Sequence, residues 1–361
     1  MKVKTLEAYR PAIAEAWNSL LPQILERDEA LQPMLQHHLN VVGKLLRPLL
    51  TVAFYDLLLS SDDSRPKYHE QVKQAAIAIE LLHNGTLVHD DLQDGDDVRR
   101  GQPTVWKSFS PYQAINAGNA LYFHAQHLLS TLELPPAIVV QLNRHLAEYS
   151  LDIINGQAAE KNLWPRIAPK GNGEFPAMSY EDATNFYLHI VEGKTSALFS
   201  LPLFTASCIA EEGTVVAESL NHIADPLGAL FQIQDDLLDL FGDKGRDSVG
   251  NDIAEGKPSL PALHCMYLAS PEDARWLFDL IQKPREETEQ SDILRAIELI
   301  RDSGALQASL ETIDHLRTTA LERCRKLPLQ VPPEPLADFL DGLCQTILKP
   351  IQHLYIDTHA A

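Results

Sequence analysis

The chain has 361 residues, of which 45% are hydrophobic and 22% are charged, so it can bury the core of a folded enzyme. Its formal net charge of -20 disfavours binding to nucleic acid or to an anionic membrane surface. Apolar residues at three- and four-residue spacing, as in Ile77 to Val88 and Leu227 to Ile233, predict buried helices, and strand-like alternation is nearly absent. We therefore expect an all-α fold.

Glycine and proline clusters divide the chain into ten or more expected helices. In chain order, the breaks are expected at 60–66, 95–103, 135–136, 165–178, 242–258, 271, 284 and 328–335. The segment 162–178 is expected to be a surface loop that can cover the mouth of an active site. The uncharged stretch 195–210 contains Pro202 and is shorter than the ~20 residues that span a bilayer, so it predicts a buried helix.

The cysteines and the amino terminus bear on the cellular compartment. The first ten residues contain Lys2 and Lys4 but lack the apolar segment of a secretory signal, which predicts a cytoplasmic location. The cysteines lack the close pairs of a metal or redox motif, and we expect reduced thiols in the core. They are Cys208, Cys265, Cys324 and Cys344.

The acidic cluster HDDLQD at 89–94 ends an apolar helical stretch. Asp90 and Asp94 are one turn apart on the same helix face, with Asp91 beside them. Like charges at this spacing are unfavourable on a bare helix, whereas Mg²⁺ prefers oxygen ligands. This DDxxD pattern alone fits a metal site or a solvated helix end about equally well.

A second cluster, QDDLLD at 234–239, places Asp235 and Asp239 one turn apart with Asp236 beside them. Two aspartate-bearing helices that face each other across a cavity can hold a diphosphate through bridging metal ions. The recurrence favours this interpretation, because metal ions allow a very acidic chain to bind an anionic substrate.

Further motifs accompany these clusters in a fixed order. They are GKLLRP at 43–48, His83, DDVRRG at 96–101, Gly156-Gln157, Gly193-Lys194-Thr195, Phe231-Gln232 and GKPS at 256–259. In this combination the chain resembles the trans-polyprenyl (isoprenyl) diphosphate synthases, such as geranylgeranyl and farnesyl diphosphate synthase, most clearly over 43–261. The resemblance implies one isoprenoid synthase domain over 1–361, built as a large helical bundle around a central hydrophobic cavity, and a homodimer.

The resemblance also implies a prenyltransferase that joins isopentenyl diphosphate head-to-tail to an allylic diphosphate and makes a linear all-trans product. Magnesium, with three ions per site and Mn²⁺ as a substitute, would be bound by Asp90, Asp94 and Asp235, supported by Asp91, Asp236 and Asp239. The residues expected to hold the allylic diphosphate are Arg99, Lys194 and Lys257. Those expected to hold isopentenyl diphosphate are Lys44, Arg47, His83 and Arg100. The backbone carbonyl near Lys194 and the side chains of Thr195 and Gln232 would face the allylic carbocation.

Taken singly, these cations have simpler interpretations. Arg99 and Arg100 would form surface salt bridges with nearby acidic residues, each lysine would be exposed, and His83 would be a packed core histidine. Their joint order along the chain favours the binding roles. Leu45 departs from the pattern, since many family members carry a second basic residue there.

In the resembling family, the two residues four and five positions before the first aspartate limit product growth. Here they are Thr86 and Gly85, and neither is large. We expect the glycine to leave a gap in the tunnel wall, so that the product grows to twenty carbons or more. The candidates for a deeper floor, or for simple core packing, are Phe54, Tyr55, Tyr122 and Phe123.

Other functions remain as alternatives. A farnesyl diphosphate synthase would share every motif, and a non-catalytic subunit of a heteromeric synthase commonly loses aspartates that are intact here. A terpene cyclase normally carries asparagine, serine or threonine, and glutamate in its second motif, which QDDLLD lacks. Against a head-to-head condensing enzyme, the GKLLRP and GKPS segments favour chain elongation.

Overall fold

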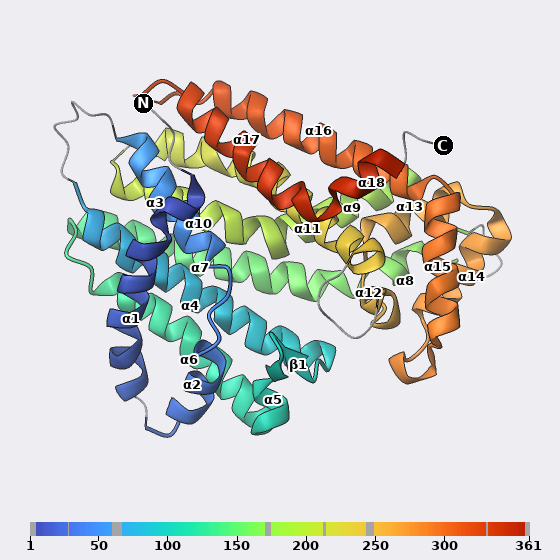
Figure 1. Cartoon of the computed structure of the whole chain (residues 1–361), viewed down its shortest axis with the longest axis horizontal. Helices are drawn as coiled ribbons and strands as arrows, with labels where there is room; N and C mark the ends of the chain where they lie inside the picture. Colours follow the sequence, from blue (N-terminus) through green and yellow to red (C-terminus); the bar gives the residue numbers. More distant parts are fainter. Residues whose placement is uncertain are drawn as a thin grey trace. The chain divides into compact units, whose positions relative to one another are not determined.

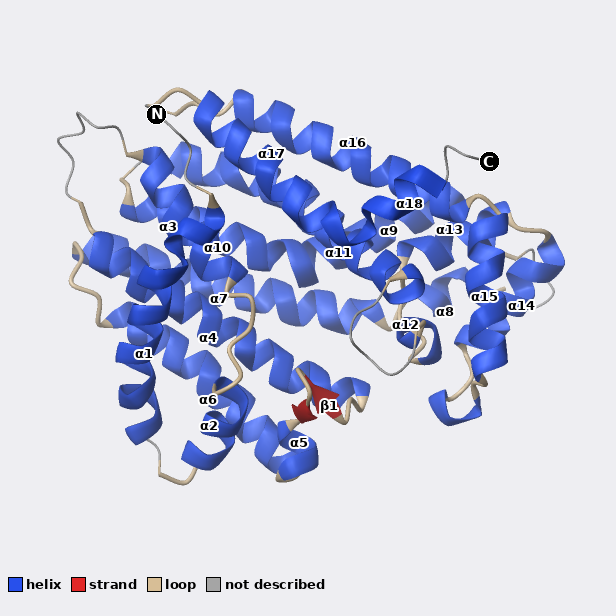
Figure 2. Ribbon diagram, viewed as in Figure 1, coloured by secondary structure: helices blue, strands red, loops and turns tan. Residues whose placement is uncertain are grey.

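The computed structural model describes residues 5–27, 29–59, 67–169, 175–211, 214–242, 249–329 and 331–357. Lys2, Lys4 and the expected break at 60–66 lie outside this part, as do portions of the breaks at 165–178 and 242–258. Helices form most of the described chain, and its strands are confined to one two-stranded hairpin (Figure 2). The all-α prediction is confirmed.

The chain divides into two compact units. The first contains residues 1–148, 198–221 and 326–339, and the second contains 149–197, 222–325 and 340–361. Figure 1 labels the helices and strands of both. Four helices are divided between the two units, because a unit boundary falls within each of them. They are α7 (Pro136–Glu160), α10 (Ala197–Ile209), α11 (Thr214–Phe241) and α17 (Glu334–Leu348).

The first unit is built around one long helix, α4 (His69–Asp94), which packs against α6 (Pro111–Ser130), α3 (Leu46–Leu58) and α1 (Arg10–Glu26). Its apolar side chains from Ile77 to Val88 are buried, as their spacing predicts, except Leu87, which is partly exposed. The unit also contains the 3₁₀-helix Leu6–Tyr9, α2 (Gln32–Leu39), β1 (Val98–Arg99), β2 (Gln102–Pro103) and α5 (Val105–Ser108). The strands pair antiparallel directly after α4 ends at Gly95, whose φ of +70° suits glycine.

Two glycines, Gly85 and Gly118, lie where α4 packs closely against α6. A Cβ atom at Gly85 would lie 3.1 Å from the Gly118 carbonyl oxygen and 3.3 Å from the Tyr122 ring, and a Cβ atom at Gly118 would overlap the His89 ring. The expected gap at Gly85 is therefore wrong: the main chain and side chains of α6 fill the space beside it. Phe123, a candidate for the tunnel floor, is 70% exposed on α6 and lines no buried wall of this unit.

In the second unit, α13 (Leu260–Leu268) packs against α14 (Pro271–Ile281), α15 (Gln290–Asp302), α16 (Ala305–Arg325) and α9 (Tyr180–Val191). Ser179 and Ser270 cap α9 and α14 by accepting hydrogen bonds from the backbone N–H three residues later. The remaining elements are α8 (Leu163–Ile167), the π-helix Glu192–Ser196, α12 (Asn251–Ala254), the 3₁₀-helices Arg285–Glu287 and Lys349–Ile351, and α18 (Gln352–Asp357).

Several local expectations can be compared with the structure. The uncharged stretch forms α10, which contains Pro202 and is largely buried, as predicted. All four cysteines are free and buried, which confirms that interpretation too. The surface-loop prediction for 162–178 is wrong in its first part, because Leu163, Trp164 and Ile167 of α8 are buried; residues 170–174 lie outside the described chain.

Candidate functional site

The first aspartate cluster occupies the last turn of α4. Asp90 and Asp94 are partly accessible, whereas Asp91 is 1% exposed and accepts a hydrogen bond from Arg99 Nε at 2.5 Å. Burial raises the pKa of Asp91 to about 6, although Arg99 opposes the shift. The other oxygen of Asp91, Oδ2, is buried and accepts no hydrogen bond from any described residue.

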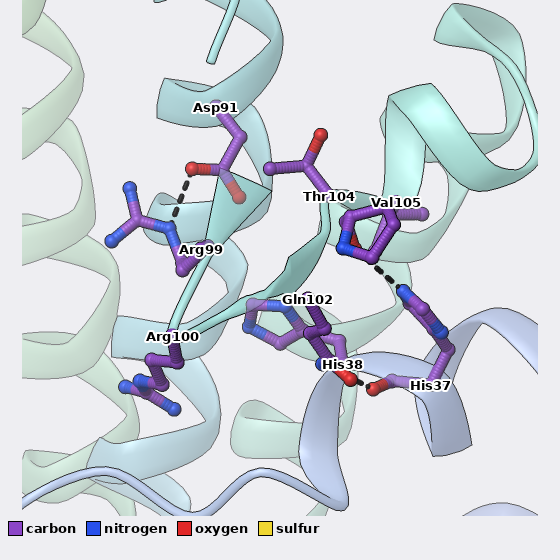
Figure 3. A pocket seen from close by; sticks show the side chains of 9 residues that line it. His37, His38, Asp91, Arg99, Arg100, Gln102, Thr104 and Val105 are labelled. Atoms are coloured by element: carbon purple, nitrogen blue, oxygen red, sulfur yellow. Dashed lines mark hydrogen bonds and ion pairs between the residues drawn. The ribbon is translucent and has the colours of Figure 1, made fainter. Parts of the chain in front are cut away.

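The hairpin that follows α4 carries both arginines of the DDVRRG motif. Figure 3 shows Arg99 extended to Asp91 and Arg100 extended away from it, with His37 and His38 across the same small pocket. Since Asp91 is buried, the Arg99 pair is not the surface salt bridge of the simpler interpretation.

Arg100 reaches back to the GKLLRP segment. Its Nη1 donates to the Val41 carbonyl at 2.6 Å, and its guanidinium fills the space that a Cβ atom at Gly43 would need. Lys44 is exposed in the same segment. Leu45, the departure from the family pattern, is 5% exposed and therefore a core residue.

Arg47 is buried, and its charge and that of Arg100 both act on His83 and on the buried Glu80. Arg47 Nε and His83 Nδ1 are buried atoms that lack hydrogen-bond partners in the described chain. Burial, with the charges of Arg47 and Arg100, holds the pKa of His83 well below its usual value, so this histidine is neutral. The structure thus brings together three of the four residues assigned to isopentenyl diphosphate.

The second aspartate cluster lies on α11 and is used differently from the first. Asp236 is 2% exposed and accepts hydrogen bonds from Tyr187 Oη at 2.9 Å, Gln232 Nε2 at 2.9 Å and the Leu260 backbone N–H at 3.2 Å. Burial, together with Asp252, raises the pKa of Asp236 to about 7.

Asp239 is also buried and accepts a hydrogen bond from the Asp252 backbone N–H at 3.0 Å. These two aspartates attach the segment 250–260, which carries Lys257, to α11. Asp235 is the more accessible member of the cluster.

Lys194 and Thr195 lie in the π-helix, between two glycine contacts. A Cβ atom at Gly156 of α7 would stand 2.4 Å from the Lys194 amide nitrogen, and one at Gly228 of α11 would stand 2.3 Å from Ser196 Oγ. Both glycines therefore allow neighbouring helices to touch the backbone that presents these residues. Thr195 Oγ1 donates to Gln232 Oε1 at 2.8 Å, so two residues assigned to the carbocation are in direct contact.

The three cations assigned to the allylic diphosphate share one feature: each pairs with a carboxylate that is less than 10% exposed. Arg99 pairs with Asp91, Lys194 pairs with Glu160 at 3.0 Å, and Lys257 pairs with Glu255 at 2.7 Å. Glu160 and Glu255 were not predicted from the sequence. Their positions at the end of α7 and just before GKPS were visible, but no pattern marked them as partners of lysines.

The donor atoms fit a hard divalent cation. Both clusters offer carboxylate oxygens, which Mg²⁺ prefers, and within the described chain no group of three or more histidine, cysteine, aspartate or glutamate residues is placed to hold a metal ion alone. Mg²⁺ is commonly bound by one or two carboxylates with substrate phosphates and water completing its shell. The available residues therefore suit a metal ion that binds together with a phosphorylated substrate.

Comparisons with known proteins agree on one family. A family model described as polyprenyl synthetase matches residues 28–300. The short chain isoprenyl diphosphate synthase of Methanocaldococcus jannaschii is 32% identical over 285 residues, which cover 78% of this chain and 80% of that protein. The geranylgeranyl pyrophosphate synthase of Geoglobus acetivorans is 34% identical over 255 residues, which cover 68% and 72%.

A solved structure extends this likeness over nearly the whole chain. The geranylgeranyl pyrophosphate synthetase from Pyrococcus horikoshii Ot3 has a TM-score of 0.78 at 25% identity, covering 95% of this chain and 98% of that one. The chain therefore belongs to the polyprenyl synthetase family, whose members are prenyl-transferring enzymes that use isopentenyl and allylic diphosphates with a divalent metal.

Proposed function

We propose that this chain condenses isopentenyl diphosphate head-to-tail with an allylic diphosphate to make a linear all-trans polyprenyl diphosphate of twenty carbons or more. One observation carries the proposal: each aspartate cluster is hydrogen-bonded to a segment that carries a basic residue, through a side chain in the first cluster and through a backbone N–H in the second. Arg99 is bonded to Asp91 in the first cluster, and in the second Asp239 holds the segment that carries Lys257. Such pairing of carboxylates and cations suits a metal-bound diphosphate.

In this proposal Asp90, Asp94 and Asp235 bind Mg²⁺, three ions with substrate present, and Mn²⁺ can replace it. The metal supplies Lewis-acid stabilisation of the departing diphosphate. Asp91, Asp236 and Asp239 act in support, which agrees with their burial and their hydrogen bonds within the protein.

The basic residues divide between the two substrates. Arg99, Lys194 and Lys257 bind the allylic diphosphate, and their buried carboxylate partners hold them in place before the substrate arrives. Isopentenyl diphosphate is bound by Lys44, Arg47, His83 and Arg100. Arg47 Nε and His83 Nδ1 lack hydrogen-bond partners among the described residues, which is consistent with a site that offers donors to phosphate oxygens.

The carbon chemistry then needs few further groups. Loss of the allylic diphosphate leaves a delocalised carbocation, which the double bond of isopentenyl diphosphate attacks. The backbone carbonyl near Lys194 and the side chains of Thr195 and Gln232 present oxygen atoms to the cation, and the hydrogen bond between Thr195 and Gln232 fixes their orientation. The released diphosphate accepts the proton that is lost when the new alkene forms.

Two observations support a product of twenty carbons or more: the small side chain of Thr86 and the names of similar proteins. Thr86 is small and buried, and its hydroxyl donates to the His83 carbonyl at 2.7 Å. Two of the similar proteins are named as geranylgeranyl pyrophosphate synthases. Thr86→Phe, which adds bulk at this position, is expected to shorten the products. A farnesyl diphosphate synthase would instead stop at fifteen carbons in the unmodified enzyme.

We also propose a homodimer. Tyr112, Ile115 and Phe123 lie along α6 at intervals of three and eight residues and are 71%, 48% and 70% exposed. A line of large apolar side chains on a helix suits burial against a second copy.

Two further predictions from the sequence are part of this proposal: a single isoprenoid synthase domain over 1–361 and a cytoplasmic location. No helix in the described part of the chain combines the length and the low charge needed to cross a membrane.

The roles of the aspartates can be tested with matched variants. Asp90→Asn and Asp235→Asn are expected to lower kcat/KM by at least about 100-fold, because each removes a ligand charge that stabilises the departing diphosphate. Asp97→Asn is the control: Asp97 is exposed and pairs with Lys107 of α5. Chelation of divalent metal should abolish turnover, and added Mg²⁺ should restore it. Full activity of Asp90→Asn and Asp235→Asn would refute the metal assignment.

A further inference from the structure

We infer that Trp164 is a positioning residue for Lys257: its indole N–H fixes the peptide from which the lysine side chain projects. This inference rests on the proposed role of Lys257 as a ligand of the allylic diphosphate. Trp164 lies on α8, in the segment 162–178 for which the sequence predicted a surface loop.

The peptide between Gly256 and Lys257 is held at both ends. Trp164 Nε1 donates to the Gly256 carbonyl oxygen at 2.9 Å, and the Lys257 N–H donates to the Asp252 carbonyl oxygen at 2.9 Å. With both its polar groups bonded, this peptide plane cannot rotate without breaking a hydrogen bond. Its orientation sets the direction in which the Lys257 side chain leaves the backbone.

Glycine is required at the position before the lysine. Gly256 has φ of +67°, and a Cβ atom there would lie 2.8 Å from the Ile281 carbonyl oxygen. An unsupported glycine has wide conformational freedom, so the main chain at this point needs an external constraint to adopt one orientation. The indole of Trp164 supplies that constraint.

The two groups that hold this peptide, the Trp164 indole and the Asp252 carbonyl, are both anchored within the second unit. Trp164 is 4% exposed, and α8 is attached to α9 through Arg166, whose guanidinium lies 4.2 Å from the centre of the Phe186 ring. On the other side, Asp252 is bonded through its N–H to Asp239 of the second aspartate cluster. These hydrogen bonds therefore connect the backbone of Lys257 to the second aspartate cluster, with which Lys257 is proposed to act.

The decisive variant is Trp164→Phe, which keeps an aromatic ring but removes the donor. Loss of one hydrogen bond predicts a rise of about 3- to 10-fold in KM for the allylic diphosphate, with KM for isopentenyl diphosphate unchanged. Trp164→His retains a ring N–H and is expected to lie closer to wild type. Trp17→Phe is the matched control, because Trp17 is also 4% exposed and its indole nitrogen has no hydrogen-bond partner in the described chain.

Hydrogen exchange gives a readout that does not depend on turnover. The amide of Lys257 should exchange faster in Trp164→Phe than in wild type, and should be unaffected in Trp17→Phe. The inference is overturned if Trp164→Phe leaves the allylic KM and this exchange rate unchanged, or if both KM values rise together. An inactive wild-type enzyme would instead refute the proposed function, while the exchange comparison would still decide whether Trp164 fixes the peptide.

Discussion

The contact between Gly156 and the π-helix predicts a large effect for a very small change, Gly156→Ala. In an open helix this substitution would stabilise the protein by about 1 kcal/mol, because alanine has the higher helix propensity. Here the new methyl group would meet three backbone atoms: the Lys194 nitrogen at 2.4 Å, the Gly193 carbonyl carbon at 2.8 Å and the Ile190 carbonyl oxygen at 3.0 Å. None of these is the end of a flexible side chain, so the backbone itself must move.

Overpacking of this kind costs about 1–3 kcal/mol, and backbone contacts place the cost at the upper end. Subtracting the gain in propensity leaves a net loss of about 2 kcal/mol in the free energy of unfolding. The atoms displaced are those that present Lys194, and misplacement of such a group by ~1 Å lowers activity by up to about 100-fold. We therefore expect Gly156→Ala to lose both stability and kcat/KM.

Gly342→Ala provides the matched control. Gly342 is exposed within α17, and a Cβ atom there would meet nothing within 4 Å. This variant should gain about 1 kcal/mol and keep wild-type kinetics. Urea unfolding of both variants, with kcat/KM for the allylic substrate, measures the two effects. The packing argument is refuted if Gly156→Ala is stabilised as much as Gly342→Ala and has unchanged kcat/KM.

Three other predictions concern buried groups and the α6 surface. Burial raises the pKa of Glu80 from 4.5 to about 7, although the charge of Arg47 opposes the shift. The folded protein therefore favours protonated Glu80. This contribution to the free energy of unfolding is complete below about pH 4.5 and is lost as the pH rises through 7. That pKa shift corresponds to about 3 kcal/mol of unfolding free energy. Glu80→Gln should therefore flatten the dependence of the unfolding free energy on pH between 4.5 and 7. An unchanged slope in the variant would contradict this prediction. Tyr187→Phe removes a donor to buried Asp236 and should cost about 1–3 kcal/mol in urea unfolding, whereas a loss near zero would show that the hydroxyl contributes little. Phe123→Glu should convert the proposed homodimer to a monomer in analytical ultracentrifugation, and a dimer that persists would place the interface elsewhere.

The helices that carry the site could be predicted because their information is local. Apolar spacing marks α4 and α11, and each acidic cluster follows directly from an apolar run. Gly95 ends α4 where the sequence break was expected. Burial of α10 followed from the same local pattern despite Pro202.

The different use of the two clusters could not be predicted from their similar letters. Asp236 and Asp239 turn inward because Tyr187, Leu260 and Asp252 donate to them, and these donors are separated from the aspartates by 13 to 49 residues. Such contacts depend on how the helices pack, which a spacing rule within one helix does not contain.

The same limitation explains the error at Gly85. From the sequence alone, the missing side chain of a glycine suggests an empty space in the structure. In a close-packed interior, however, a glycine usually marks the approach of another backbone. Here that backbone is α6 at Gly118. Trp164 was missed for a similar reason, since prolines and glycines suggested a loop while its partner, Gly256, lies 92 residues further on.

The most direct test of the account is a product analysis with the purified wild-type chain. The protein would be incubated with Mg²⁺, labelled isopentenyl diphosphate and, in separate reactions, five-, ten-, fifteen- and twenty-carbon allylic diphosphates, and the products would be identified by chromatography and mass spectrometry. The account predicts a linear all-trans diphosphate of twenty carbons or more. Products that stop at fifteen carbons, when shorter primers are supplied, would contradict the proposed chain length. Absence of condensation with every allylic primer would contradict the central claim itself.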